Sequence, residues 1–145
     1  MSNPFTVSLV SWHDGEPLLR AIREEVFIRE QNVPEELEWD EMDDGSRHAL
    51  ALSLSGDAIG CGRILPNGHI GRIAVLQQWR NQRVGTAIME ALLGEARSRG
   101  FKQVDVDAQV QAIPFYYNFG FIEQGEEFMD AGMPHKKMTL ALEPS

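Results

Sequence analysis

The chain has 145 residues, with 13 lysines and arginines against 22 aspartates and glutamates, and a net charge of −9. A chain of this length forms one domain with its own core, so we expect a single domain over residues 1–145. Its 43% hydrophobic and 24% charged residues are typical of a soluble globular protein, not of a disordered or membrane protein. The acidic balance makes nucleic acid a poor partner and suits a cationic ligand better.

The sequence favours a cytoplasmic location. Its first residues show no basic region followed by an apolar run, which a secretory signal would need. No apolar stretch approaches the ~18 residues that a membrane-spanning helix requires, so we expect no membrane association. The single cysteine, Cys61, cannot form an internal disulfide, which suits a reducing compartment. We expect Cys61 to be a small buried hydrophobe.

The first part of the chain is predicted to contain a strand, a helical region and three further strands. Alternating apolar residues predict a strand over residues 5–12. A helix is expected to open at residues 14–17, with Pro17 in its first turn, and to continue toward Glu30. An acidic segment over residues 35–44 follows. Three strands joined by short turns are then predicted over residues 48–55, 58–65 and 69–76.

The second part begins with the clearest helix, over residues 84–99, which has one apolar face and ends at Gly100. A strand over residues 104–110 and a short aromatic helix over residues 112–119 follow, and two closing strands are predicted over residues 121–128 and 136–142. The order is β-α-α-β-β-β-α-β-α-β-β. It predicts an α/β fold of the α+β type, with a mixed, mostly antiparallel sheet of six to seven strands flanked by about four helices.

The junction between residues 72 and 93 gathers three arginines in an acidic chain. Unpaired N–H groups at the start of the helix over residues 84–99 form an anion site, and Gly85 lets a ligand approach the backbone. A Walker loop is excluded because no Gly-Lys-Ser/Thr follows, and a dinucleotide fingerprint is excluded because its other glycines are absent. Spacing alone leaves another interpretation open, namely a glycine for helix packing beside two surface arginines.

A second motif decides in favour of the anion site. The run from Val75 to Ala87, with the later Ala112…Phe115-Tyr116…Gly120-Phe121, resembles the GNAT superfamily of acyl-CoA-dependent N-acetyltransferases. The first part resembles its pyrophosphate motif, Arg/Gln-x-x-Gly-x-Gly/Ala, and the second its A-x-x-F-Y-x-x-x-G-F segment. The order of elements matches that fold across essentially the whole chain. The chain is also similar to the bacterial ElaA-like subgroup, at residues 25–34, 38–43, 48, 107–109 and 131–135.

The chain departs from the family motif at one position, where Arg83 replaces the first glycine. A left-handed backbone at this residue would cost ~1–2 kcal/mol with a non-glycine side chain. A right-handed conformation would avoid that cost. The backbone conformation of Arg83 therefore tests how closely residues 80–86, the corner before this helix, follow the family motif.

The resemblance implies that an amine directly attacks the thioester of acetyl-CoA in a ternary complex. The thioester arm would pair with the strand edge near Ile73, and the backbone N–H of Val75 would face the developing oxyanion. Tyr116 would donate a hydrogen bond to the leaving sulfur. The residues implied to bind acetyl-CoA are Ile73, Val75, Arg80, Asn81, Gln82, Arg83, Val84, Gly85, Thr86, Gln109 and Tyr116. No pair of residues has metal-ligand spacing, so we expect no metal.

The acceptor is expected to be a small-molecule amine or a peptide amine, and its identity stays open. The general base also stays open, since a water relay is as good a candidate as any side chain. Candidates for contact with the acceptor, some of which could act as the base, are Glu30, Trp39, Asp40, Asp43, His48 and His135. The acidic segment at residues 35–44 has two interpretations, a solvated surface or a lip that attracts a cation.

Two competing functions remain at this stage. One is an acyl-CoA-binding sensor or interaction module without efficient turnover, and the other is a structural protein with an incidental helix corner. The oligomeric state is also open, with a homodimer among the alternatives.

Overall fold

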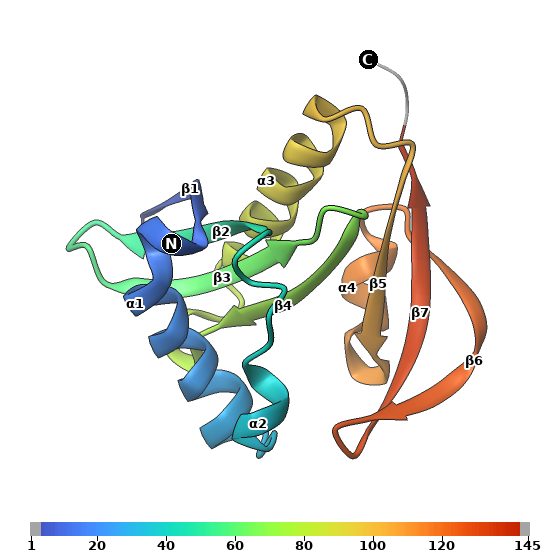
Figure 1. Cartoon of the computed structure of the whole chain (residues 1–145), viewed down its shortest axis with the longest axis horizontal. Helices are drawn as coiled ribbons and strands as arrows, with labels where there is room; N and C mark the ends of the chain where they lie inside the picture. Colours follow the sequence, from blue (N-terminus) through green and yellow to red (C-terminus); the bar gives the residue numbers. More distant parts are fainter. Residues whose placement is uncertain (1–3, 143–145) are drawn as a thin grey trace.

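A seven-stranded sheet organises the chain. The computed structural model describes residues 4–142, in which the strands lie in the order β1-β2-β3-β4-β5-β7-β6 (Figure 1). Every neighbouring pair is antiparallel except β4 and β5. The predicted mixed, mostly antiparallel sheet is therefore confirmed. The strands are β1 (Phe5–Ser11), β2 (Arg47–Ser53), β3 (Ala58–Ile64), β4 (His69–Val75), β5 (Gln103–Gln109), β6 (Ile122–Asp130) and β7 (Met133–Ala141).

Four α-helices accompany the sheet within these residues, as predicted. They are α1 (Trp12–Arg23), α2 (Glu35–Glu38), α3 (Val84–Ser98) and α4 (Ile113–Tyr117). A π-helical segment, η1 (Glu24–Glu30), extends α1, and short 3₁₀ turns form η2 (Gln77–Trp79) and η3 (Val110–Ala112). None of the helices in the described part of the chain is both long and apolar enough to cross a membrane.

The two long helices cover opposite faces of the sheet (Figure 1). Side chains alternate along β2, so Ala49 and Ala51 join the core beneath α3 while Leu50 joins the core beneath α1. Leu19 and Ile22 of α1 and Val26 of η1 are buried on the α1 side, together with Cys61. Burial raises the pKa of the Cys61 thiol to about 12, so this cysteine stays protonated at neutral pH.

Two glycines in β3 let α3 lie close to the sheet. A Cβ on Gly60 would come within 2.9 Å of Ile88 Cδ1, and one on Gly62 within 2.8 Å of Ile88 Cγ2. Contacts this short would force the helix away from the strand. The close approach places the first residues of α3 beside the end of β4, where the functional site lies.

The first helix starts earlier than predicted. Ser11 accepts a hydrogen bond from the backbone N–H of Asp14, at 3.1 Å, and so caps a helix that begins at Trp12. Pro17 consequently lies inside α1 and not in its first turn. The strands differ from their predicted bounds by one to three residues. Residues 1–3 and 143–145, which were included in the predicted domain, lie outside the described residues.

Strands β4 and β5 pair only at their beginnings. The parallel register joins His69 to Asp105 and Ile70 to Val106 and goes no further. Strand β5 instead pairs with β7 over its full length, while β4 remains paired with β3. The two strands therefore separate like the arms of a V, and the sheet is open along the second half of β4 (Figure 1).

Candidate active site

A cavity of about 820 Å³ fills the opening between β4 and β5. Its walls come from η1 and the segment through α2, from β4, the corner before α3, the end of β5, α4 and the turn between β6 and β7. A cavity of this size accommodates a cofactor-sized ligand. The region is thus built from segments far apart in the sequence, all of which meet where the sheet opens.

A bulge in β4 shapes the inner wall of the cavity. Arg63 pairs with Gly71 and Cys61 with Ala74, so two residues of β4, Arg72 and Ile73, lie opposite one residue of β3. Arg72 has a φ of 52°, in the left-handed region that a non-glycine residue seldom occupies. The bulge turns the following backbone toward the opening.

The alternation of the β3–β4 ladder indicates where the Val75 backbone points. The Leu76 N–H donates to the Ile59 carbonyl at 2.9 Å, which makes the next pair, Gly60 and Val75, a non-hydrogen-bonded one. The amide and carbonyl of Val75 consequently point away from β3, toward the open side of the sheet. Consistent with this direction, the Val75 carbonyl accepts a bond from Arg80 Nε at 3.0 Å.

The corner before α3 has the geometry of an anion site. Asn81 and Arg83 are left-handed, with φ values of 64° and 69°, and α3 begins directly after Arg83. A left-handed residue followed by a helical one turns successive N–H groups toward one concave surface, and the helix N-terminus adds partial positive charge. Among the predicted corner residues, Arg80, Asn81, Arg83, Val84, Gly85 and Thr86 line the cavity. Gln82 is outside the lining, and its side-chain amide donates to the Gln78 carbonyl.

Arg83 adopts the strained alternative that the sequence left open, with φ 69° and ψ 16°. We expect Arg83→Gly to raise the free energy of unfolding by up to about 1 kcal/mol, because relief of ~1–2 kcal/mol of strain exceeds the entropic cost of glycine. Urea denaturation measures the change. Arg83→Ala is the matched control, since it removes the guanidinium but keeps the Cβ. Equal stability of the two variants would contradict the strain argument.

Arg80 and Glu30 form an ion pair that the sequence did not predict. The Arg80 guanidinium makes two bonds of 2.7 Å to the Glu30 carboxylate, in addition to its bond to the Val75 carbonyl. The bond from Arg80 lowers the pKa of Glu30, which stays ionised at neutral pH and is a weak base. The ion pair ties the end of η1 to the end of β4. Glu30 does not line the cavity, and its contact with the acceptor stays a prediction.

Tyr116 enters the cavity from α4. Its side chain is only 9% exposed and packs edge-on against Phe115 and Phe121. Burial raises the pKa of the Tyr116 phenol to about 12, so the group is a neutral hydrogen-bond donor over the whole physiological range. Ile73 and Gln109 also line the cavity, and the Gln109 amide donates to Gln31 Oε1 at 2.9 Å.

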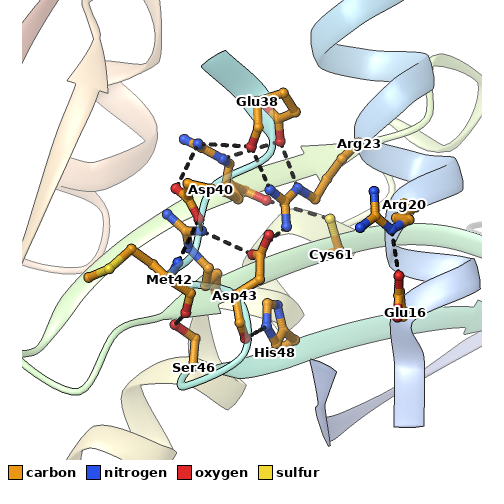
Figure 2. Close-up of polar contacts among 12 residues, drawn as sticks. Glu16, Arg20, Arg23, Glu38, Asp40, Met42, Asp43, Ser46, His48 and Cys61 are labelled. Carbon is orange, nitrogen blue, oxygen red and sulfur yellow. Dashed lines mark hydrogen bonds and ion pairs between the residues drawn. The ribbon is translucent and has the colours of Figure 1, made fainter. Parts of the chain in front are cut away.

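The acidic segment is only partly a solvated surface: Glu35, Glu36, Glu41 and Asp44 are exposed, but Glu38 and Asp43 are buried in an arginine network (Figure 2). Arg23 Nε donates to Glu38 at 2.6 Å and its Nη1 to Asp43 at 2.7 Å. Arg63 Nη1 donates to Asp40 and Asp43 at 2.8 and 3.0 Å. Arg72, the bulge residue, lies within 3.2 Å of both Glu38 and Asp40. Three arginines thus balance three carboxylates.

This network changes the interpretation of four predicted acceptor contacts. Asp43 and His48 are buried, and the His48 ring, whose pKa burial lowers, bonds the Asp43 carbonyl at 3.0 Å. The Trp39 ring stacks on Arg23 at 5.0 Å, and Asp40 binds Arg63. None of these four residues lines the cavity between β4 and β5, whereas Trp39, Asp40 and Asp43 line a separate hollow beside α1. Their contact with the acceptor stays a prediction. They hold residues 35–44 against α1, β3 and the bulge of β4.

The comparison with known proteins gives the family. Residues 13–142 match the family described as the acetyltransferase (GNAT) domain. The chain belongs to the GNAT acetyltransferases. The GNAT resemblance of the sequence is thereby confirmed.

Several GNAT relatives are similar over most of this chain. The uncharacterized N-acetyltransferase YjcF of Bacillus subtilis is 40% identical over 121 residues, which are 81% of this chain and 86% of YjcF. The Escherichia coli protein ElaA is 30% identical over 83% of this chain and 84% of its own. Its crystal structure superposes with a TM-score of 0.82 at 27% identity, covering 92% of this chain and 98% of ElaA. An acyl-CoA N-acyltransferase from Pseudomonas aeruginosa superposes with a TM-score of 0.84 at 26% identity. The match covers 95% of this chain and 100% of that protein. The predicted ElaA-like character is confirmed.

Three further ionisable residues of this GNAT domain, none of them among the predicted site residues, lie in the cavity. His69, Asp107 and Asp130 line it, and of the predicted acceptor contacts only His135 does. The His69 ring bonds the Asp105 carboxylate, its register partner on β5. The period-two series Asp105, Asp107 and Gln109 was a signal in the sequence, since these residues share one face of a strand. Within residues 4–142, no three His, Cys, Asp or Glu side chains are placed to hold a metal ion.

Proposed function

We propose that the chain is an acyl-CoA-dependent N-acetyltransferase, which moves the acetyl group of acetyl-CoA to a primary amine by direct attack in a ternary complex. The observation that carries this proposal is the single cavity that joins an open strand edge, an anion-binding corner and a buried tyrosine. Membership of the GNAT family and similarity to an acyl-CoA N-acyltransferase support it.

At the corner before α3, backbone N–H groups would hold a diphosphate more than charged side chains would. Arg80 is neutralised by Glu30, so Arg83 supplies the net cation near the start of α3. The amides from residue 81 to residue 86 would hold the diphosphate through helix-terminus and nest geometry. Local backbone polarity thus explains how an acidic protein could hold an anionic cosubstrate.

The open edge of β4 fits the thioester arm. Since the Val75 amide points toward the opening, it is the donor that we assign to the developing oxyanion. Tyr116 would donate its hydroxyl to the departing sulfur. The acceptor amine would enter from the part of the cavity lined by β5 and the β6–β7 turn, opposite the corner.

Gly85→Ala tests the cosubstrate directly. A Cβ on Gly85 would lie 3.5 Å from the Phe115 ring, an ordinary contact, so the protein itself has room for a methyl group there. The glycine nevertheless lines the cavity at the second residue of α3, where a ligand would approach. We expect the variant to be at least as stable as the native protein, because alanine favours helix, and to bind acetyl-CoA about tenfold more weakly.

Calorimetric titration with acetyl-CoA measures this effect. Gly94→Ala is the matched control: it lies in the same helix, has open space around it, and should leave affinity unchanged. At 100-fold excess over the dissociation constant, acetyl-CoA should stabilise the native protein by ~2.7 kcal/mol. No stabilisation would refute the cosubstrate. Binding without thiol release in the presence of any amine would instead favour the sensor function.

A further inference from the structure

Two strands bring a histidine and two aspartates together where the sheet begins to open. His69 is the first residue of β4, and Asp105 is its register partner on the parallel strand β5. Asp107 lies two residues further along β5, on the same face. The group therefore lies at the apex of the V, at the inner end of the cavity.

The bond to Asp105 orients the imidazole. His69 Nδ1 bonds the Asp105 carboxylate, and a carboxylate can only accept, so Nδ1 carries the proton. The other ring nitrogen, Nε2, is left with its lone pair when the ring is neutral. A histidine that is held in one tautomer by a carboxylate is the arrangement of a proton acceptor.

The free nitrogen lies in the wall of the cavity, just before the bulge of β4. A Cβ on Gly71 would lie 3.8 Å from His69 Nε2, so this nitrogen lies over the residue just before the bulge at Arg72. Asp107 Oδ2 is 3.8 Å from the same nitrogen, too far for a direct hydrogen bond. This arrangement leaves Nε2 and the Asp107 carboxylate side by side and available to one ligand group.

The charges around the pair favour a cation. Of the ionisable groups on the packed strands, Asp105 and Asp107 face His69 from β5, and Lys137 is the register partner of Asp107 on β7. Asp130 lines the cavity from the end of β6. The carboxylates outnumber the lysine. Arg72 also lines the cavity from β4, but it is paired with Glu38 and Asp40, and the arginines of the corner lie at the other end of β4.

We propose that His69 is the general base of the transfer and that Asp107 binds the acceptor as an ammonium ion, a role that rests on the proposed function. The ammonium loses one proton through intervening water to His69 Nε2, which passes it to solvent. The freed nitrogen attacks the thioester carbonyl, so that a C–N bond forms as the C–S bond breaks. The second nitrogen proton ends on the departing sulfur.

The test uses two amines of similar size that differ in basicity. Ethylamine is almost entirely protonated at neutral pH, whereas 2,2,2-trifluoroethylamine is mostly unprotonated and needs no base to become a nucleophile. Thiol release from acetyl-CoA is measured for the native protein, His69→Gln, Asp107→Asn and a control, His13→Gln, which changes an exposed histidine of α1. Acetyl-CoA binding is measured for each protein.

We expect His69→Gln to lower kcat with ethylamine about 100-fold and with trifluoroethylamine less than threefold. Asp107→Asn should raise KM for ethylamine about tenfold with little change in kcat, and His13→Gln should change neither. Acetyl-CoA affinity should be unchanged in all four proteins. Equal losses with both amines, no loss with ethylamine, or no transfer by the native protein to either amine would overturn the role of His69. Failure of the native protein to bind acetyl-CoA would instead refute the proposed function.

Discussion

Arg23→Leu is expected to lower the free energy of unfolding by about 3–5 kcal/mol, the usual cost of removing one partner from a buried ion pair. The Arg23 side chain is only 1% exposed and donates to Glu38 and Asp43, which are themselves 2% and 3% exposed. Without the guanidinium, both carboxylates would stay buried beside one cation fewer. Leucine supplies apolar volume but no charge, so it cannot offset this loss.

Urea denaturation measures the change, and Arg20→Leu is its matched control. Arg20 lies about one turn earlier on α1 and stacks on the same two rings, Trp12 and Trp39. It pairs with Glu16, however, and its side chain is 44% exposed. An exposed pair of this kind contributes less than about 1 kcal/mol. If the two variants lost equal stability, the stacking on tryptophan and not the buried charge would be the source of the effect.

The same network connects stability with the active site. Glu38 binds Arg23 from α1 and also lies 3.2 Å from Nε of Arg72. Arg72 is the left-handed residue of the bulge that turns β4 toward the cavity. Strain at such a residue persists where surrounding contacts hold it in place. We therefore interpret the network as the support that keeps the edge of β4 in position.

Local patterns in the sequence predicted the elements well. The apolar face of α3 is continuous over four turns, and the strand alternation is strong enough to place each strand within three residues. The corner and the Tyr116 segment were identified together because each is a contiguous motif. Such features depend on neighbours along the chain, which a sequence displays directly.

Pairings across long stretches of chain could not be predicted in this way. Glu38 and Asp43 looked like exposed acidic residues because their partners, Arg23 and Arg63, lie on other elements. Glu30 and Arg80 are separated by 50 residues, and only the fold brings them into contact. His69 meets Asp105 through the one parallel strand pair of the sheet. The charge of a residue predicts neither whether its side chain is buried nor which residue it pairs with, until the strand order is known.

Tyr116→Phe is expected to lower kcat about 10- to 100-fold while acetyl-CoA affinity changes less than twofold. With a phenol pKa of about 12 and an ordinary thiol near ~8.5, full proton transfer to the leaving sulfur would be uphill by about 5 kcal/mol. The hydroxyl would therefore act by donating a hydrogen bond to developing negative charge. Hydrogen bonds to charged groups contribute about 1.5–3 kcal/mol, which corresponds to the expected loss of rate.

Thiol release at saturating acetyl-CoA measures kcat, and Tyr117→Phe is the matched control. Tyr117 is the next residue of α4, but its side chain is about half exposed, its hydroxyl bonds Glu123, and it does not line the cavity. We expect its removal to leave both kcat and affinity unchanged. A loss of acetyl-CoA binding in Tyr116→Phe would show that the ring hydroxyl supports the cavity and not the leaving group. Unchanged turnover would mean that the thiolate departs without this donor, and the role of Tyr116 would then be packing against Phe115 and Phe121.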